Sequence, residues 1–233
     1  MKLFGMARAL QEQLAQPDII SIPFEERLGM LVDREVDYRE NKRLARLLKE
    51  AKLKQQACVE DVDFRHPRGL DRAVFFSLAD CRWIREHHNL IITGPTGVGK
   101  TFIACALANK ACRLGFTVRY WRTSRLLPAV ATARADGSYA TLIHKLQKTD
   151  LLLLDDWGIS PLQVDEARDL LDILEDRNQT RSTLITSQMP VNQWHNVLAD
   201  PTLADAILDR LVHNAYKLEL RGESMRKLMT KLD

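Results

Sequence analysis

The chain has 233 residues, of which 45% are hydrophobic and 28% charged, and its formal net charge is +3. This apolar content exceeds that of disordered chains, no uncharged run is long enough to cross a membrane, and the net charge alone indicates no partner. The four cysteines show no Cys-x-x-Cys spacing and the N-terminus has no secretory-signal pattern, so we expect a cytoplasmic protein with reduced thiols.

The N-terminal part of the sequence predicts helices. From about residue 5 to 57 the pattern is helical, with a break around Pro17 and Pro23. Residues 58–72 mix acidic residues with proline and glycine and show little periodicity, which is typical of a linker. The expected division is a helical DNA- or partner-binding domain over 1–57, a linker over 58–72 and a nucleotide-binding domain over 73–233.

One stretch of the N-terminal region is strongly basic. Between Arg39 and Lys54, seven basic residues stand against two acidic ones. At 100° per residue, one face of a helix here is apolar, formed by Leu44, Leu47, Leu48 and Ala51. The opposite face carries Arg39, Lys42, Arg43, Arg46 and Lys49. Such a face can neutralise DNA phosphates without reading sequence, but many charged helix faces are only solvated. The residues alone favour neither interpretation.

Beyond the linker, short apolar runs alternate with segments of helical periodicity. The expected strands cover 89–93, 116–121, 150–155, 182–187 and 216–220. A helical segment follows the first strand and ends at Gly115, a residue suited to a helix C-cap. This alternation predicts an α/β domain with a mostly parallel sheet flanked by helices.

The segment GPTGVGKT lies between the first expected strand and that helix. It matches the phosphate-loop pattern Gly-x-x-x-x-Gly-Lys-Thr at every position. Amides of such a loop bind phosphate oxygens, Lys100 can reach the β- and γ-phosphates, and the Thr101 hydroxyl can ligate Mg²⁺. The expected nucleotide contacts are Gly94, Pro95, Thr96, Gly97, Val98, Gly99, Lys100, Thr101 and Phe102. The chain is therefore predicted to bind ATP with Mg²⁺.

Two adjacent carboxylates end the run LLLLDDWG. Asp155 stands where related sites hold Mg²⁺, and we expect it on a strand next to the one before the phosphate loop, close to Thr101. Asp156 stands where many such ATPases carry a glutamate that activates the attacking water, although aspartate is one methylene shorter. A kinase needs no second acid at this point, so the pair favours ATP hydrolysis with Asp156 as the base.

The chain carries, in order, the segments EERLGMLVDREVDYRENKRLARLLKEAKL, VEDVDFR, GPTGVGKTFIACALA, LLLLDDWGISPL, TSQMPVNQWH, ADAILDRL and LRGESMRK. Together these segments resemble the IstB-type transposition helper ATPases, which are AAA+ proteins related to helicase loaders of the DnaC type. The resemblance covers nearly the whole sequence. It implies an AAA+ domain without a full C-terminal lid, in keeping with the 13 residues that follow Leu220.

The resemblance also implies roles for single residues. Gln188, or alternatively Ser187, is expected to sense the γ-phosphate. Arg210 resembles the arginine finger that reaches the nucleotide of a neighbouring subunit. Arg226 resembles a further nucleotide-contacting arginine, although only a short segment supports it. For the basic face, the resemblance favours binding of duplex DNA with little sequence preference.

The expected function is that of an ATP-dependent helper that forms a homo-oligomer on duplex DNA and presents the DNA to the transposase of the same mobile element. No membrane partner is expected. A helicase loader would share the nucleotide site but would bind a replicative helicase. The residues also leave open a small-molecule kinase, which the acid pair disfavours, and a DNA-binding scaffold that does not hydrolyse ATP.

Overall fold

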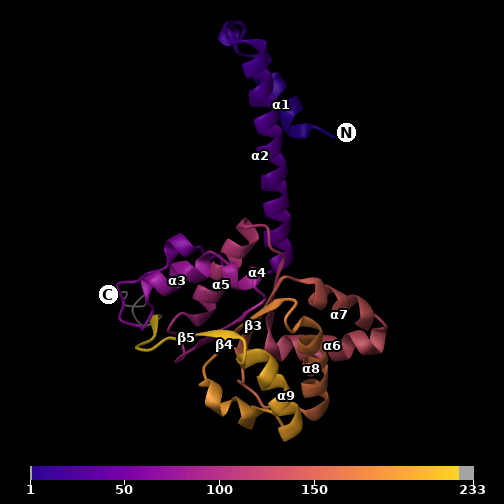
Figure 1. The fold of residues 1–233 in the computed structure, drawn as a ribbon. Helices are drawn as coiled ribbons and strands as arrows, with labels where there is room; N and C mark the ends of the chain where they lie inside the picture. The colour runs from indigo at the N-terminus through magenta and orange to yellow at the C-terminus, as the bar shows by residue number, and fades with distance from the viewer. Residues whose placement is uncertain (1, 226–233) are drawn as a thin grey trace, which may run out of the picture. The chain divides into compact units, whose positions relative to one another are not determined.

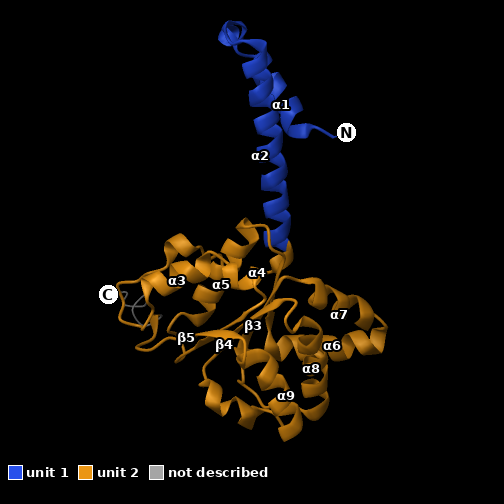
Figure 2. Ribbon diagram, in the orientation of Figure 1, with its two compact units in different colours: residues 1–49 blue, residues 50–233 orange. Residues whose placement is uncertain are grey.

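The computed structural model describes residues 2–225 of the chain. The chain divides into two compact units, residues 1–49 and 50–233 (Figure 2). The domain limits that the sequence suggests, at residues 57 and 72, stay predictions. The segment expected to be a linker lies within the second unit, because its residues pack against the sheet-containing part of the chain; Arg68, for example, is 4% exposed.

The first unit is helical, as expected. It contains the α-helix α1 (Phe4–Leu14), the 3₁₀-helix η1 (Pro17–Ser21) and most of the α-helix α2 (Phe24–Ala51). The predicted break occurs where Pro17 opens η1, since proline lacks the amide donor that a continuing helix needs. Helix α1 lies directly against α2 at Gly5, where a Cβ atom would stand 2.6 Å from Cβ of Tyr38. The carboxylate of Glu35 accepts a hydrogen bond from the Met6 amide at 3.0 Å and ties the two helices together.

The second unit alternates strands and helices. Its strands are β1 (Asn89–Thr93), β2 (Val118–Arg122), β3 (Leu151–Trp157), β4 (Ser182–Ser187) and β5 (Ala215–Glu219). Its α-helices are α3 (Arg72–Ala79), α4 (Arg82–Arg85), α5 (Lys100–Arg113), α6 (Thr123–Asp136), α7 (Tyr139–Lys148), α8 (Val164–Arg177) and α9 (Pro201–Val212). Two 3₁₀-helices, η2 (Val59–Asp61) and η3 (Val191–Val197), complete the unit.

The five strands form one sheet in the order β2-β3-β4-β1-β5, and every neighbouring pair is parallel. Helices lie on both sides of the sheet, α3 and α5 on one and α6, α8 and α9 on the other (Figure 1). The expected α/β architecture is therefore confirmed. Strands β1 and β4 have the predicted limits, whereas β3 runs two residues further than predicted, through Asp156 to Trp157.

The core lies between the sheet and its two helix layers. On one face, strand residues such as Ile91, Leu152 and Ile185 join side chains of α6, α8 and α9 in a continuous apolar cluster. The alternate strand residues point to the other face, against α5, where Ile103 and Leu107 are fully buried. Each such side chain contributes roughly 1.5–3 kcal/mol relative to exposure. This packing holds the strand ends rigidly in place.

The parallel arrangement brings the carboxyl ends of all five strands to one edge of the sheet, which is where open α/β sheets bind ligands. Within the described residues, no helical lid domain follows β5. The segment after β5 runs instead beside the loop that follows β1, with the Met225 amide donating to the Gly97 carbonyl at 2.9 Å. None of the described helices combines the length and apolarity that a membrane span requires.

Candidate nucleotide-binding site

The loop between β1 and α5 has the conformation that a phosphate loop requires. Gly97 and Gly99 have φ angles of 83° and 101°, a region that favours glycine, and helix α5 begins directly after them. Gly94 also has to lack a side chain, since a Cβ there would stand 2.3 Å from the Leu220 carbonyl oxygen. The Lys100 ammonium lies inside the loop and donates to the carbonyls of Gly94 and Pro95, both at 2.8 Å. The predicted loop residues are thus brought together.

Asp155 ends the apolar run of β3 and is completely buried. One carboxylate oxygen, Oδ1, accepts hydrogen bonds from the hydroxyls of Thr101 at 2.8 Å and Thr186 at 2.6 Å. The other, Oδ2, accepts from the Tyr120 hydroxyl at 2.6 Å and from the Lys54 ammonium at 3.3 Å. The carboxylate therefore has a fixed orientation, with Thr101 directly beside it.

These contacts keep Asp155 ionised. Burial raises the pKa of the carboxyl, but the hydrogen bonds from Thr186, Tyr120 and Thr101 and the nearby Lys54 charge outweigh burial, so its pKa lies below the ordinary value. An ionised carboxylate beside a threonine hydroxyl is an oxygen donor set that suits Mg²⁺. The residues present therefore fit the expected metal, and Thr101 and Asp155 stay its predicted ligands.

The strand order corrects one expectation about this pair. Asp155 was expected on the strand next to β1, but β4 lies between β1 and β3. Thr101 still reaches Asp155 because it stands in the first turn of α5, above the strand ends. The intervening strand supplies Thr186, whose hydroxyl donates to Asp155 and accepts from the Asp156 amide at 3.2 Å.

Asp156 follows Asp155 in an irregular part of β3. The register of β3 against β4 shifts between Leu154 and Trp157, and Asp156 has a φ of 63°. This left-handed conformation costs roughly 1–3 kcal/mol in a residue other than glycine and recurs at functional sites. Its carboxylate is 27% exposed and lies 3.8 Å from both Lys54 and Arg122. The two acids thus differ, one being buried and the other facing the cavity.

The residue after β4 also contacts the phosphate loop. Gln188 accepts a hydrogen bond from the Thr96 hydroxyl at 2.6 Å. Its neighbour Ser187 is buried and points elsewhere, donating to the Trp157 carbonyl at 2.9 Å and accepting from the Met189 amide. Of the two candidates for a γ-phosphate sensor, Gln188 is the one whose side chain reaches the loop.

A cavity of about 480 Å³ lies against the phosphate loop, which is within the range of small-molecule sites. Phe102, Asp156 and Gln188 line it together with Lys100 and Thr101. The rest of its wall comes from elsewhere in the chain, namely from Lys54, Gln55, Asp61, Asp63, Arg68, Arg122, Ile159 and Met225. The segment expected to be a linker is therefore part of the wall of this site.

Sequence reasoning missed several residues at the site, of which four contact the acid pair or the loop. Thr186 places a hydroxyl near the end of the buried strand β4, which is a signal that could have identified it, and Tyr120 lies in the middle of β2. Lys54 and Arg68 gave no such signal, because Lys54 is 101 positions from Asp155 and Arg68 is 30 positions from Val98, which it contacts. Their positions follow only from the folding of the 50–69 segment onto the loop.

One predicted site residue within the described part of the chain, Arg210, is not brought to the cavity. Arg210 on α9 lies near the opposite end of β1, where its carbonyl accepts from the Asn89 side chain at 2.9 Å. Its guanidinium pairs with Glu175 and donates to the Ala206 carbonyl. Arg226 lies outside the described residues.

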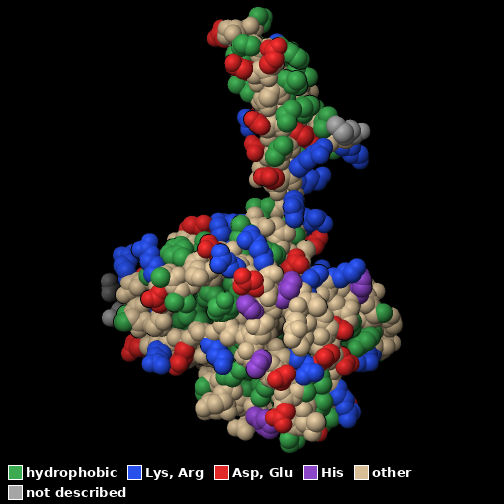
Figure 3. Space-filling model, in the orientation of Figure 1, with side chains coloured by type: hydrophobic (Ala, Val, Ile, Leu, Met, Phe, Trp, Pro, Cys, Tyr) green, Lys and Arg blue, Asp and Glu red, His purple; other side chains and the backbone are tan. Residues whose placement is uncertain are grey.

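The five basic residues predicted to contact DNA are all exposed on α2, whereas Leu47 and Ala51 of the opposite face are buried. Figure 3 shows Lys and Arg side chains gathered along the C-terminal half of this helix. Arg39 forms an ion pair with Glu35 at 2.7 Å, and the Lys42 ammonium lies 5.9 Å from the ring centres of Phe4 and Tyr38. The face has the predicted geometry, and its contact with DNA stays a prediction.

Comparison with known proteins agrees with this site. The family model described as IstB-like ATP binding protein matches residues 1–232. An insertion sequence ATP-binding protein of Sinorhizobium fredii is 51% identical over 227 residues, which cover 97% of this chain and 93% of that protein.

Solved structures agree with the fold. The structure of DnaI has a TM-score of 0.62 at 23% identity, covering 71% of this chain and 91% of that one. The DnaC helicase loader has a TM-score of 0.56 at 19% identity, covering 64% and 86%. At these identities the likeness establishes the fold alone, which is of the AAA+ type that the sequence indicated. Since the family model spans almost the whole sequence, the chain belongs to the family of IstB-like ATP binding proteins.

Proposed function

We propose that the protein is a Mg²⁺-dependent ATPase that assembles on duplex DNA and presents the DNA to the transposase of its own mobile element. The observation that carries the ATPase part is the meeting of Lys100, Thr101 and Asp156 at one cavity of suitable size, with the buried Asp155 bonded to Thr101. The insertion-sequence relative supports transposition as the process, in preference to helicase loading.

The site residues divide the work of hydrolysis. The loop amides and Lys100 bind and orient the phosphates of ATP. Bound Mg²⁺, held by Thr101 and Asp155, would neutralise charge on the β- and γ-phosphates. The Asp156 carboxylate faces the cavity and accepts a proton from the water that attacks the γ-phosphorus. Gln188, held at the loop by Thr96, is placed to sense whether the γ-phosphate is present.

Assembly on DNA uses other parts of the chain. The exposed basic face of α2 neutralises phosphates of the duplex, with the release of counterions. Arg210 lies at the end of β1 away from the phosphate loop, so it serves the nucleotide of a neighbouring subunit. ATP then stabilises the oligomer by linking subunits, and hydrolysis releases it from the DNA.

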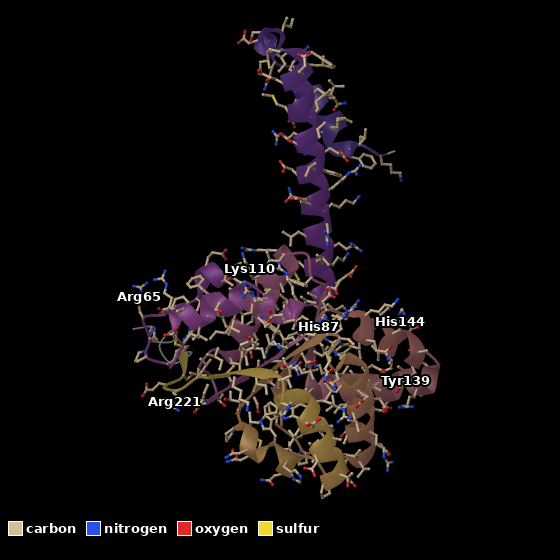
Figure 4. The ribbon with its side chains drawn as sticks, in the orientation of Figure 1. Arg65, His87, Lys110, Tyr139, His144 and Arg221 are labelled. Atoms are coloured by element: carbon tan, nitrogen blue, oxygen red, sulfur yellow. The ribbon has the colours of Figure 1, made fainter. Side chains whose placement is uncertain are left out.

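Lys100→Ala tests the nucleotide site, and Lys110→Ala is its control, because both lysines lie on α5 but Lys110 stands near the other end of the helix (Figure 4). We expect Lys100→Ala to abolish binding of a fluorescent ATP analogue and Lys110→Ala to bind normally. Retained binding by Lys100→Ala would refute the assignment of the phosphate loop.

The same variants test the wider function. Wild-type protein with ATP and Mg²⁺ should form large complexes on duplex DNA and retain the transposase encoded beside it, as measured by electron microscopy and co-sedimentation. Lys100→Ala should do neither. Transposase capture that is independent of ATP would contradict the proposed role of the nucleotide.

A further inference from the structure

The guanidinium of Arg68 is buried beside the phosphate loop. Arg68 lies between η2 and α3 and is 4% exposed. Its Nη1 donates to the Val98 carbonyl at 3.2 Å and its Nη2 to the Asp63 carbonyl at 2.7 Å. Its own carbonyl accepts from the Arg221 amide at 2.9 Å. Through its side chain and its backbone, Arg68 therefore links the loop to the segments before α3 and after β5.

No carboxylate lies within ion-pair distance of the Arg68 guanidinium among the described residues. Its hydrogen-bond acceptors there are backbone carbonyls, and its buried Nε has no partner. A buried cation without a directly paired anion costs several kcal/mol, and an unsatisfied donor adds to that cost. Burial lowers the pKa of Arg68, and the charge of Asp63 opposes this only in part. Such a group is stabilised when an anion binds next to it.

Arg68 lies at the cavity that the phosphate loop lines. Arg68 lines it together with Lys100 and Thr101. The close approach depends on Gly99, because a Cβ at that position would stand 2.6 Å from Nη1 of Arg68. Two nearby arginines differ: Arg65 and Arg221 are exposed and point outward from the unit (Figure 4). Of these three arginines, only Arg68 is buried against the loop.

We propose that Arg68 is a second cationic ligand of the nucleotide phosphates, in addition to Lys100, and that its guanidinium donates to them. The inference rests on the proposed function, in which this cavity holds ATP. The forked guanidinium suits the task, because it has five N–H groups and the loop and the Asp63 turn use only two of them. The bound phosphate supplies the directly paired anion that Arg68 lacks among the described residues.

Arg68→Gln is the variant that tests this proposal, with Arg65→Gln as a matched control on the same segment. We expect Arg68→Gln to weaken binding of a fluorescent ADP analogue roughly ten- to hundredfold, the range for a hydrogen bond to a charged group. Adenosine, which has no phosphate, should compete equally well against the wild type and Arg68→Gln. Arg65→Gln should bind ADP as the wild type does.

Thermal unfolding separates this role from a purely structural one. If Arg68 binds phosphate, the increase in melting temperature caused by ADP should be much smaller in Arg68→Gln than in the wild type. If Arg68 only clamps the loop, the variant will melt lower without nucleotide but gain the same increment with ADP, and that result overturns the proposal. An equal loss of ADP and adenosine affinity overturns it as well.

A second variant and two controls distinguish failure of folding, failure of the proposed function and failure of the present inference. If Arg68→Gln does not fold, Arg68→Met replaces it under the same criteria, because methionine retains the apolar packing of the side-chain stem. If wild-type protein binds no nucleotide, the proposed function itself fails. If Lys100→Ala loses binding while Arg68→Gln binds ADP normally, only the present inference fails.

Discussion

Asp155 and Asp156 are adjacent in sequence but have different surroundings. Asp155 accepts four hydrogen bonds and is inaccessible to solvent, so its carboxylate has a fixed orientation beside Thr101. Asp156 is displaced by the irregularity in β3 and faces the cavity, where it can reach a water molecule. These environments support separate roles for the two acids in ATP hydrolysis.

Conservative substitutions should separate the two roles. Asp155→Asn should impair Mg²⁺-dependent ATP binding and therefore assembly on DNA. Asp156→Asn should bind ATP but hydrolyse it more slowly, by about 10²–10⁴, the usual contribution of a general base. Phosphate release and the dissociation of DNA complexes after ATP is diluted out measure both effects.

The two variants should have opposite effects on the lifetime of the DNA complex. Complexes of Asp156→Asn should persist longer than those of the wild type, whereas Asp155→Asn should hardly form them. A wild-type hydrolysis rate in Asp156→Asn would show that this carboxylate is not the base.

Lys54 lies at the acid pair, 3.3 Å from Asp155 and 3.8 Å from Asp156. Its ammonium neutralises the carboxylates that a divalent cation needs. We therefore expect Lys54→Ala to bind Mn²⁺ more tightly without nucleotide, by a few-fold, since a partly exposed ion pair is worth at most about 1 kcal/mol. Paramagnetic resonance of Mn²⁺ measures this, and Lys52→Ala, an exposed neighbour, is the control. An unchanged Mn²⁺ affinity in Lys54→Ala would mean that this lysine does not compete with the metal.

At the scale of elements, helix α2 changes character along its length. Its C-terminal half carries the exposed basic face, while its N-terminal half packs against α1 around Glu35 and Gly5. Arg39 and Lys42 take part in contacts within the first unit, so their replacement would disturb its packing. Arg43, Arg46 and Lys49 are exposed on the same face, further along the helix from these contacts, and serve as the positions for testing DNA binding.

Reversal of these three residues to glutamate should weaken DNA binding and leave ATP affinity unchanged. Each phosphate contact contributes roughly 0.9 to the slope of log affinity against log salt. Loss of three contacts should therefore make the slope of the variant shallower than that of the wild type by roughly 2.7. Fluorescence anisotropy with a labelled duplex at several salt concentrations measures it. The control carries the same charge change on exposed residues of α7 and α8, as Lys145→Glu, Lys148→Glu and Arg168→Glu. An equal loss in the control would place the DNA contact elsewhere.

At the scale of the whole molecule, the position of Arg210 decides whether it can reach the nucleotide site of its own chain. It lies beside Asn89 at the start of β1, while the phosphate loop follows Thr93 at its end, about 13 Å further at roughly 3.3 Å per residue. Arg210 therefore does not line the cavity of its own chain, and its action on the nucleotide of another subunit stays a prediction. In the single chain, Glu175 holds its guanidinium.

Mixing two inactive variants tests this arrangement. Arg210→Ala lacks the arginine but keeps the acid pair, whereas Asp156→Asn lacks the base but keeps the arginine. If Arg210 acts between subunits, mixed oligomers contain some interfaces with both groups, and phosphate release should exceed that of either variant alone. No recovery on mixing, with mixed oligomers confirmed by light scattering and affinity tags, would contradict an action between subunits.

The phosphate loop and the strand pattern could be predicted from the sequence because their causes are local. Gly97, Gly99 and Lys100 adopt their conformation within one short turn, and apolar runs such as Leu151–Leu154 form buried strands wherever a sheet is available. The distinct surroundings of Asp155 and Asp156 could be anticipated only in outline, since the irregularity of β3 depends on its pairing with β4.

Only the tertiary structure decided which distant groups complete the site. The strand order places β4 and its Thr186 between β1 and β3, and no local pattern encodes that order. The folding of residues 50–69 onto the loop brings Lys54 to the acid pair and Arg68 to Val98, in a segment whose composition suggested a linker. Contacts across 30 to 101 residues depend on the packing of the whole unit, whereas periodicity reports only on neighbours along the chain.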